Sequence, residues 1–138
     1  MIRSFDEVFA KIKELPKKVV AVAAAEDDAV LEAINFCRTN GLAEAILVGD
    51  EVEIQRIAKD LKGIQIINEQ DPAKSALLAA EQVSTGKADM LMKGLVDTKS
   101  FLRAVLNKEV GLRTGNLITH VGVFDIPPYD RLLHITDG

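Results

Sequence analysis

The sequence lacks the long apolar segments of membrane and secreted proteins. Its longest apolar stretch, residues 19–25, is far shorter than the roughly 20 residues that a membrane helix needs. Arg3, Asp6 and Glu7 interrupt the apolar residues at the N-terminus, so no continuous apolar region of the kind that a secretory signal requires is found there. We therefore expect a cytoplasmic protein without a membrane partner.

Cysteine and histidine are scarce, with one cysteine and two histidines in 138 residues. A single cysteine excludes an intramolecular disulfide and any multi-cysteine metal site. Cys37 falls at helical spacing from Val30 and Ile34, where a cysteine is more often a small core residue than a nucleophile. The two histidines lie far apart without a nearby carboxylate pattern, so we expect no metal site.

Clustered positive charge is also missing, because the net charge is −4 and no basic stripe is present. Nucleic acid is therefore not expected as a partner, since binding to a phosphate backbone needs clustered Lys and Arg. One local anion site remains compatible with this charge. The chain has 48% hydrophobic and 28% charged residues and no low-complexity tract, which indicates a folded protein of about one domain.

Strand-like and helical patterns alternate four times between residues 19 and 106. Residues 19–25 form a continuous apolar run, which is typical of a strand covered on both faces of a parallel sheet. Further strands are predicted at residues 44–49, 64–67 and 89–92, each followed by a helix. Because helices that join parallel strands cover the sheet, the pattern predicts a three-layer, doubly wound α/β fold with helices on both faces of a mostly parallel sheet.

Helix starts and the C-terminal region give further predictions. Ser4 and Glu7 have the spacing of a capping box at the start of a first helix, Asp27 or Asp28 caps a second, and Asp71-Pro72 begins another. The alternation breaks near Gly111. Residues 116–124 and 132–136 then predict an antiparallel hairpin near the C-terminus, at a sheet edge.

Residues 88–103 combine a strand end, a glycine-containing turn and a helix start. Gly94 would let the backbone approach a ligand closely, and Asp97 or Thr98 could cap the helix. The backbone donors beyond that cap would attract an anion, and Lys93 and Arg103 add positive charge on either side. A phosphate would fit at this corner, although most strand-turn-helix corners of α/β proteins bind nothing.

Three motifs resemble the phosphate acetyl/butyryl transferase family, with its butyryl branch the closer match. The motifs are residues 88–94 continuing to Thr98 and Arg103, residues 115–121, and residues 132–138, with weaker support from residues 25–28. The resemblance covers the whole chain. It implies acyl exchange between coenzyme A and inorganic phosphate, so that a coenzyme A thioester and phosphate are the substrates and no cofactor is covalently bound.

The resemblance also implies binding roles for six residues. Those on the phosphate- and coenzyme-facing side of the family's cleft are Lys93, Gly94, Thr98 and Arg103, followed by Thr119 and His120 in a polar strand motif. Arg103 lies off the apolar face of its helix and could reach a ligand, whereas without the resemblance a solvated arginine is the simpler interpretation. The catalytic residues stay unassigned, because the resemblance places the family's proposed serine, arginine and aspartate beyond residue 138.

The resemblance further implies that residues 1–138 form a single α/β domain, the N-terminal part of a larger two-domain acyltransferase. We expect this part alone to be inactive and the full-length protein to form a homo-oligomer. Two alternatives stay open, a phosphate acetyltransferase and a non-catalytic ligand-binding or assembly module with the same sheet. A nucleotide-dependent dehydrogenase is disfavoured, because no Gly-x-Gly-x-x-Gly motif follows residues 19–25.

Overall fold

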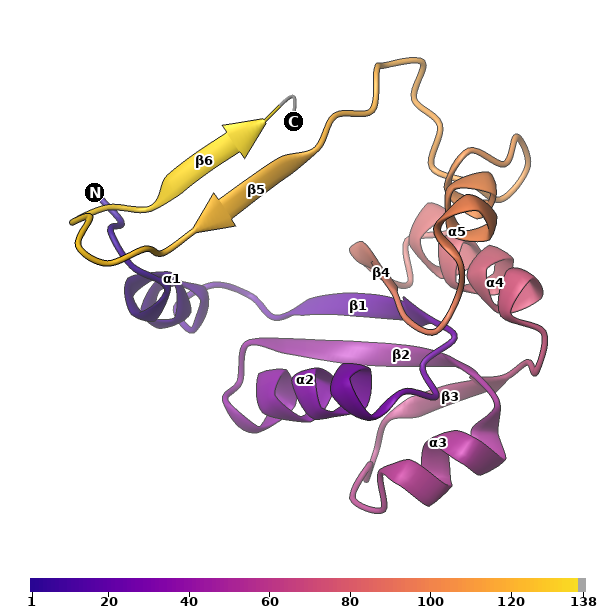
Figure 1. Cartoon of the computed structure of the whole chain (residues 1–138). Helices are drawn as coiled ribbons and strands as arrows, with labels where there is room; N and C mark the ends of the chain where they lie inside the picture. Colours follow the sequence, from indigo (N-terminus) through magenta and orange to yellow (C-terminus); the bar gives the residue numbers. More distant parts are fainter. Residues whose placement is uncertain (137–138) are drawn as a thin grey trace. The chain divides into compact units, whose positions relative to one another are not determined.

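The computed structural model describes residues 1–136, which divide into two compact units. The larger unit comprises residues 17–114, and the smaller unit comprises residues 1–16 and 115–136. Figure 1 labels the helices and strands of both units. That residues 1–138 form one domain of a longer protein stays a prediction.

The larger unit is built on a four-stranded parallel sheet with the strand order β3-β2-β1-β4. Its strands are β1 (Lys18–Ala23), β2 (Ala43–Gly49), β3 (Gln65–Asn68) and β4 (Met90–Lys93). The register places Ala23 opposite Val48 on one side and opposite Lys93 on the other. Because all three pairings are parallel, the carboxyl ends of the four strands lie at the same end of the sheet.

A helix follows each strand of this sheet. The four helices are α2 (Asp28–Thr39), α3 (Glu51–Ile57), α4 (Pro72–Ser84) and α5 (Thr98–Val105). Ile34 of α2 and Ile54 of α3 belong to the core on one face of the sheet, whereas Ala79 of α4 and Ala104 of α5 belong to the core on the other. Figure 1 shows these two helix layers on opposite sides of the sheet. The predicted doubly wound, three-layer α/β fold is therefore confirmed.

Strand β1 lies at the centre of this arrangement, with a neighbouring strand on each edge. Residues 21–25 are completely buried. Ala21 and Ala23 face the core beneath α4 and α5, and Val22 faces the core beneath α2 and α3. Burial on both faces explains why this segment is apolar without polar alternation. The strand ends two residues earlier than predicted, because Ala24 turns into the left-handed conformation with φ of 50°.

An aspartate caps each of the four helices that follow a strand. The caps are Asp27, Asp50, Asp71 and Asp97, and each carboxylate accepts a hydrogen bond from an amide in the first turn. These bonds satisfy donors that no carbonyl within the helix can reach. These bonds identify Asp27, and not Asp28, as the cap of α2, and Asp97, and not Thr98, as the cap of α5.

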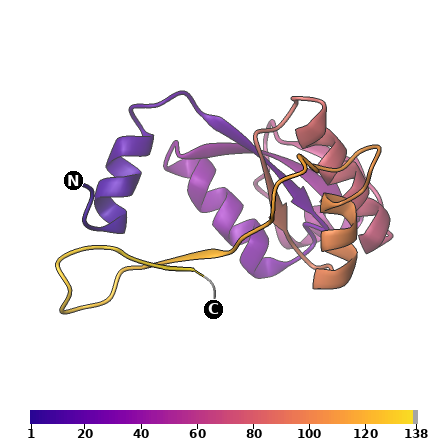
Figure 2. The same ribbon diagram turned by 90° about the horizontal axis from the view of Figure 1, so that it is seen from above.

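The smaller unit contains α1 (Phe5–Ile12), β5 (Val121–Phe124) and β6 (Leu133–Thr136). The predicted cap of α1 is confirmed, because Ser4 accepts a hydrogen bond from the amide of Glu7. Strands β5 and β6 pair antiparallel and are drawn as adjacent arrows in Figure 1, whereas Figure 2 shows the same pair edge-on. No helix among residues 1–136 is long and apolar enough to cross a membrane.

The hairpin near the C-terminus is thus confirmed, but two of its details were wrong. Among residues 1–136 it forms a separate two-stranded sheet and is not an edge of the larger one. Strand β5 begins at Val121 and not at Asn116. Val121 pairs with Thr136, the last described residue of the partner strand, so within the described part of the chain no strand pairs with residues 116–120. An extended sequence pattern forms a strand only where a second strand supplies hydrogen bonds.

The burial pattern of α3 gives a first testable prediction. Ile54 is completely buried, whereas Val52 on the same helix is 70% exposed. We expect Ile54→Ala to lower the free energy of unfolding by about 2–5 kcal/mol, because it removes buried methyl groups and leaves a cavity. Val52→Ala, the matched control, should change it by less than about 0.5 kcal/mol. Equilibrium unfolding in urea measures both values, and equal losses would contradict the burial of Ile54.

Candidate active site

The order of the strands creates a switch point between β1 and β4. The chain passes from β1 to β2 and β3 on one side and then returns to the other side of β1 as β4. The helix that follows β1 packs on one face of the sheet and the helix that follows β4 packs on the other. The two connections leave the sheet in opposite directions, which marks the position where open α/β sheets bind ligands.

Three of the predicted residues lie at the β4 side of this switch point. Lys93 is the last residue of β4, Gly94 begins the turn, and Thr98 is the first residue of α5. Lys93 is exposed. It lies on the α4–α5 side of the sheet, because Leu91, two residues earlier in the strand, packs in the core on that side. The structure therefore brings these three residues to one corner.

Gly94 is required by the packing of the two strand ends. Its amide donates a hydrogen bond of 2.8 Å to the carbonyl of Ala23. A Cβ atom at this position would overlap the carbonyl oxygens of Ala23 and Ala24. Since both are backbone atoms at the end of β1, they cannot rotate away as a side chain could. The close approach that glycine permits here is thus to strand β1.

The end of β1 is held in a strained conformation by bonds from two directions. The left-handed φ of Ala24 is unfavourable for a residue other than glycine and costs about 1–3 kcal/mol. The amide of Ala24 donates to the Ser75 hydroxyl oxygen at 2.8 Å, and that hydroxyl donates to the carbonyl of Val48 at 2.9 Å. The carbonyl of Ala24 accepts the amide of Leu95 at 2.7 Å. Helix α4 and the turn after β4 therefore both fix this residue.

Neither Ala24 nor Ser75 is predicted from the sequence. Ala24 is hidden within an apolar run, because nothing in its own side chain favours a left-handed conformation. Ser75 did offer a signal, since it is a polar residue next to Ala76, on the side of α4 that also buries Ala79. It is completely buried, and a buried hydroxyl is normally hydrogen-bonded.

The start of α5, where an anion is expected, already carries the carboxylate of the protein's own Asp97. The Asp97 carboxylate accepts the amide of Ser100 at 2.9 Å, and the amides of Leu95 and Val96 already donate to backbone carbonyls. Hydrogen bonds from the hydroxyl and the amide of Ser100 hold the pKa of Asp97 below its ordinary value. Asp97 is therefore ionised at neutral pH and opposes a second anion at this helix start. Attraction of an anion falls to the cationic side chains nearby.

Three cations lie on β4 and α5, namely Lys93, Lys99 and Arg103. All three are exposed, and within residues 1–136 none of them takes part in an ion pair. Lys99 and Arg103 are four residues apart and are therefore neighbours on the helix surface. Thr98 and Arg103 differ by about 140° around the helix axis and by about 7.5 Å along it. Arg103 is thus grouped with Lys99, a cation that the sequence motifs did not identify, and not with Thr98.

Thr119 and His120 belong to the smaller unit. Both are exposed and directly precede β5. The backbone carbonyl of His120 accepts a hydrogen bond of 2.8 Å from the hydroxyl of Thr136. That these two residues share a site with Lys93 stays a prediction.

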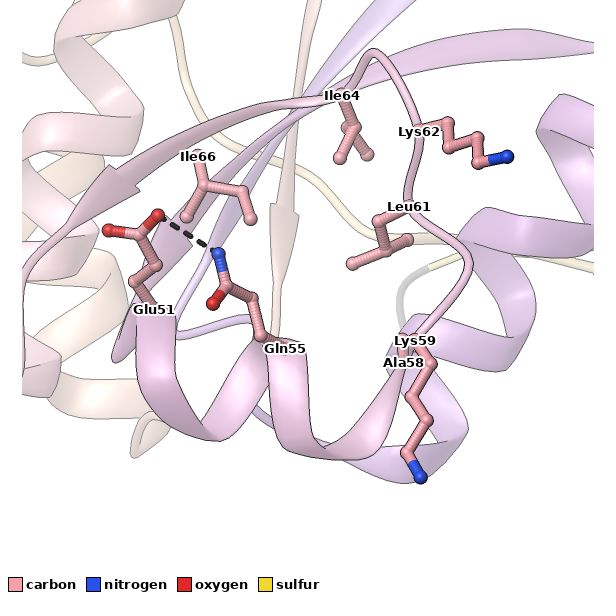
Figure 3. Close-up of a pocket in the computed structure, with 8 residues that line it drawn as sticks. All are labelled: Glu51, Gln55, Ala58, Lys59, Leu61, Lys62, Ile64 and Ile66. Carbon is pink, nitrogen blue, oxygen red and sulfur yellow. Dashed lines mark hydrogen bonds between the residues drawn. The ribbon is translucent and has the colours of Figure 1, made fainter.

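A pocket of about 520 Å³ lies at the opposite edge of the sheet, between α3 and β3 (Figure 3). It is lined by Glu51, Gln55, Ala58, Lys59, Leu61, Lys62, Ile64 and Ile66. Figure 3 shows the ammonium groups of Lys59 and Lys62 pointing away from the hollow. The pocket contains none of the predicted site residues and directs no cation inward. Within residues 1–136, no group of three His, Cys, Asp or Glu side chains could hold a metal ion.

The cap of α5 gives a second prediction, which separates its charge from its hydrogen bonds. Asn is as good an N-cap as Asp, whereas Ala cannot accept the amide bond. Near pH 7, Asp97→Ala should therefore lower the free energy of unfolding, and Asp97→Asn should lower it much less. Because folding lowers the Asp97 pKa, its charge stabilises the fold fully above the unfolded value of 3.8. This contribution is lost as the pH falls through the lower folded value.

Urea unfolding of the three proteins near pH 7 and near pH 2 measures this difference. The gap between the wild type and Asp97→Ala should shrink at the lower pH. An equal gap at both pH values would contradict an ionised cap.

Comparison with known proteins identifies the family. Residues 4–76 and 63–138 match the family described as phosphate acetyl/butaryl transferase. The chain is 56% identical over 142 residues to phosphate butyryltransferase of Clostridium beijerinckii, a match that covers 100% of this chain and 47% of that protein. It is 41% identical over 124 residues to phosphate acetyltransferase of Thermotoga maritima, covering 87% of this chain and 42% of the relative.

Solved structures agree at the level of the fold. A branched-chain phosphotransacylase from Enterococcus faecalis V583 matches with a TM-score of 0.65 and 20% identity, covering 87% of this chain and 42% of that chain. A phosphotransacetylase from Staphylococcus aureus matches with a TM-score of 0.66 and 18% identity, covering 94% of this chain and 49% of that chain. The chain spans about half the length of the curated relatives that it matches. Since the two family matches together extend from residue 4 to residue 138, the chain belongs to the phosphate acetyl/butaryl transferase family.

Proposed function

We propose that this chain is the N-terminal part of an acyl-coenzyme A:phosphate acyltransferase of the phosphate butyryltransferase type. The reaction converts butyryl-coenzyme A and phosphate into butyryl phosphate and coenzyme A. The observation that carries the proposal is 56% identity, over the whole chain, to a protein named phosphate butyryltransferase. Because the chain spans only about half of that relative, the complete activity belongs to the longer protein.

The chemistry of this reaction sets three requirements. A phosphate oxygen attacks the thioester carbonyl, an oxyanion develops, and the coenzyme A thiolate leaves and takes up a proton. The protein must therefore hold an anion, donate hydrogen bonds to the oxyanion and manage the thiol proton. The unpaired cations Lys93, Lys99 and Arg103 supply the first of these.

Charge at the carboxyl end of the sheet favours the β4 side for a phosphate. All four helix starts, including that of α5, carry a capping carboxylate that disfavours an anion, so the cationic side chains make the difference. Lys93 ends β4, and Lys99 and Arg103 follow on α5. An anionic substrate is therefore attracted to the switch point from the side of β4.

The thiol proton has no convincing acceptor in the larger unit. Asp89 and Asp97 each lie four residues from Lys93, but their lowered pKa values make both weak bases, and they accept the amides of Val19 and Ser100 respectively. We assign the catalytic groups to the remainder of the longer protein. The same proposal includes a cytoplasmic homo-oligomer that acts on small-molecule substrates without a resident metal or cofactor, nucleic acid or membrane.

A phosphate acetyltransferase is the second candidate, supported by 41% identity to the Thermotoga maritima protein. The two candidates differ in the acyl chain and share the phosphate site. Comparison of kcat/KM for butyryl-coenzyme A and acetyl-coenzyme A in the full-length protein distinguishes them. The proposal expects the higher value for the butyryl substrate.

A third prediction concerns turnover. Residues 1–138 alone should show no phosphate-dependent release of free thiol from butyryl-coenzyme A, whereas the full-length protein should, because loss of acid–base assistance alone costs about a hundredfold to ten-thousandfold. In the full-length protein, Arg103→Ala should lower kcat/KM by about ten- to a hundredfold through loss of a charge-assisted contact worth roughly 1.5–3 kcal/mol.

Lys62→Ala removes an exposed cation at the opposite edge of the sheet and is the matched control, with kcat/KM expected to stay unchanged. Thiol release is followed with and without phosphate. Phosphate-dependent turnover by residues 1–138 would show that the catalytic groups lie within this half. Equal losses in the two variants would remove Arg103 from the site.

A further inference from the structure

Ser75 is a buried polar residue on α4, beside a core that consists largely of alanines. It is completely buried on α4, next to Ala76 and on the side that also buries Ala79. Its hydroxyl makes two hydrogen bonds, one accepted from the amide of Ala24 at 2.8 Å and one donated to the carbonyl of Val48 at 2.9 Å. One side chain thereby ties α4 to the carboxyl ends of both β1 and β2.

The bond to Ala24 has a particular consequence, because that residue has a left-handed φ of 50°. The amide of Ala24 is buried at the end of the central strand, so it needs an acceptor within the protein. Ser75 supplies that acceptor, and the bond fixes the orientation of the peptide unit between Ala23 and Ala24. The hydroxyl therefore holds the peptide plane that directly precedes the left-handed residue.

The same geometry fixes the turn after β4. Two consecutive carbonyls at the end of β1 accept the turn's first two amides, Ala23 that of Gly94 at 2.8 Å and Ala24 that of Leu95 at 2.7 Å. A change in the dihedral angles of Ala24 would redirect its carbonyl and release Leu95. Lys93 directly precedes this turn and Asp97, the cap of α5, directly follows it. Hydrogen bonds thus connect Ser75, through Ala23 and Ala24, to the turn that lies between Lys93 and α5.

We infer that Ser75 is a positioning residue for the phosphate site: its hydroxyl fixes the peptide unit between Ala23 and the left-handed Ala24 and, through the carbonyls of these two residues, the Gly94–Leu95 turn between Lys93 and α5. The role in phosphate binding rests on the proposed function, whereas the hydrogen-bond path itself does not. Ser75 does not contact the ligand.

Three variants of the full-length protein test this role. Ser75→Ala removes both hydrogen bonds. Ala24→Gly in the Ser75→Ala background should restore the turn, because glycine adopts a positive φ without strain and no longer depends on the hydroxyl. Ile54→Val lowers stability through the core on the opposite face of the sheet and is the matched control for destabilisation.

Two measurements are made on each variant: hydrogen exchange of peptides covering residues 90–98, and the KM for inorganic phosphate with kcat. In Ser75→Ala we expect exchange in this segment to accelerate and the phosphate KM to rise, each by about tenfold, with a smaller change in kcat. The double variant should recover most of both effects. Ile54→Val should show neither.

The role would be overturned if either hydrogen exchange or the phosphate KM stayed at the wild-type value in Ser75→Ala. Equal changes in Ile54→Val, or no recovery in the double variant, would also overturn it. Absence of phosphate-dependent thiol release by the wild-type protein would instead reject the proposed function. The exchange comparison would still decide whether Ser75 holds the turn.

Discussion

The carboxyl end of β1 is the constraint on which the rest of the structure depends. This strand has neighbours on both edges and helices on both faces, so its last backbone groups cannot reach water and must be bonded within the protein. The amide of Ala24 uses Ser75 of α4, the carbonyl of Ala24 uses Leu95 after β4, and the amide of Ala25 uses Val48 of β2 at 3.0 Å. Satisfying one strand end therefore joins two strands and a helix at the switch point.

The helix starts at this end of the sheet give the site an unusual electrostatic basis. Helix N-termini commonly attract anions, but here each of the four helices after a strand begins with an aspartate whose carboxylate accepts an amide of the first turn and adds a negative charge there. In the proposed phosphate site, attraction then depends on the side chains of Lys93, Lys99 and Arg103. Because these cations are exposed, the attraction should weaken with salt.

Much of this fold could be predicted because local patterns agreed with the long-range arrangement. An apolar run such as residues 19–25 fits only a strand covered on both faces, and Asp71-Pro72 has one common role at a helix start. The left-handed Ala24 could not be predicted, because bonds from distant residues impose it. The first residue of β5 could not be predicted either, because it depends on where the partner strand ends. The hydrogen bond at the start of α5 depends on the orientation of the Asp97 carboxylate, which the sequence does not specify.

The most direct test of the corner as an anion site is a titration of the 138-residue chain with inorganic phosphate, followed by the backbone amide shifts of the labelled protein. We expect saturable shifts that are largest at Lys93, Thr98 and Lys99 and that disappear in a Lys93→Gln, Lys99→Gln double variant. Added sodium chloride should weaken them. Shifts confined to the α3–β3 pocket around residues 58–66, or shifts unchanged in the double variant, would contradict the assignment of the phosphate site to the β4–α5 corner.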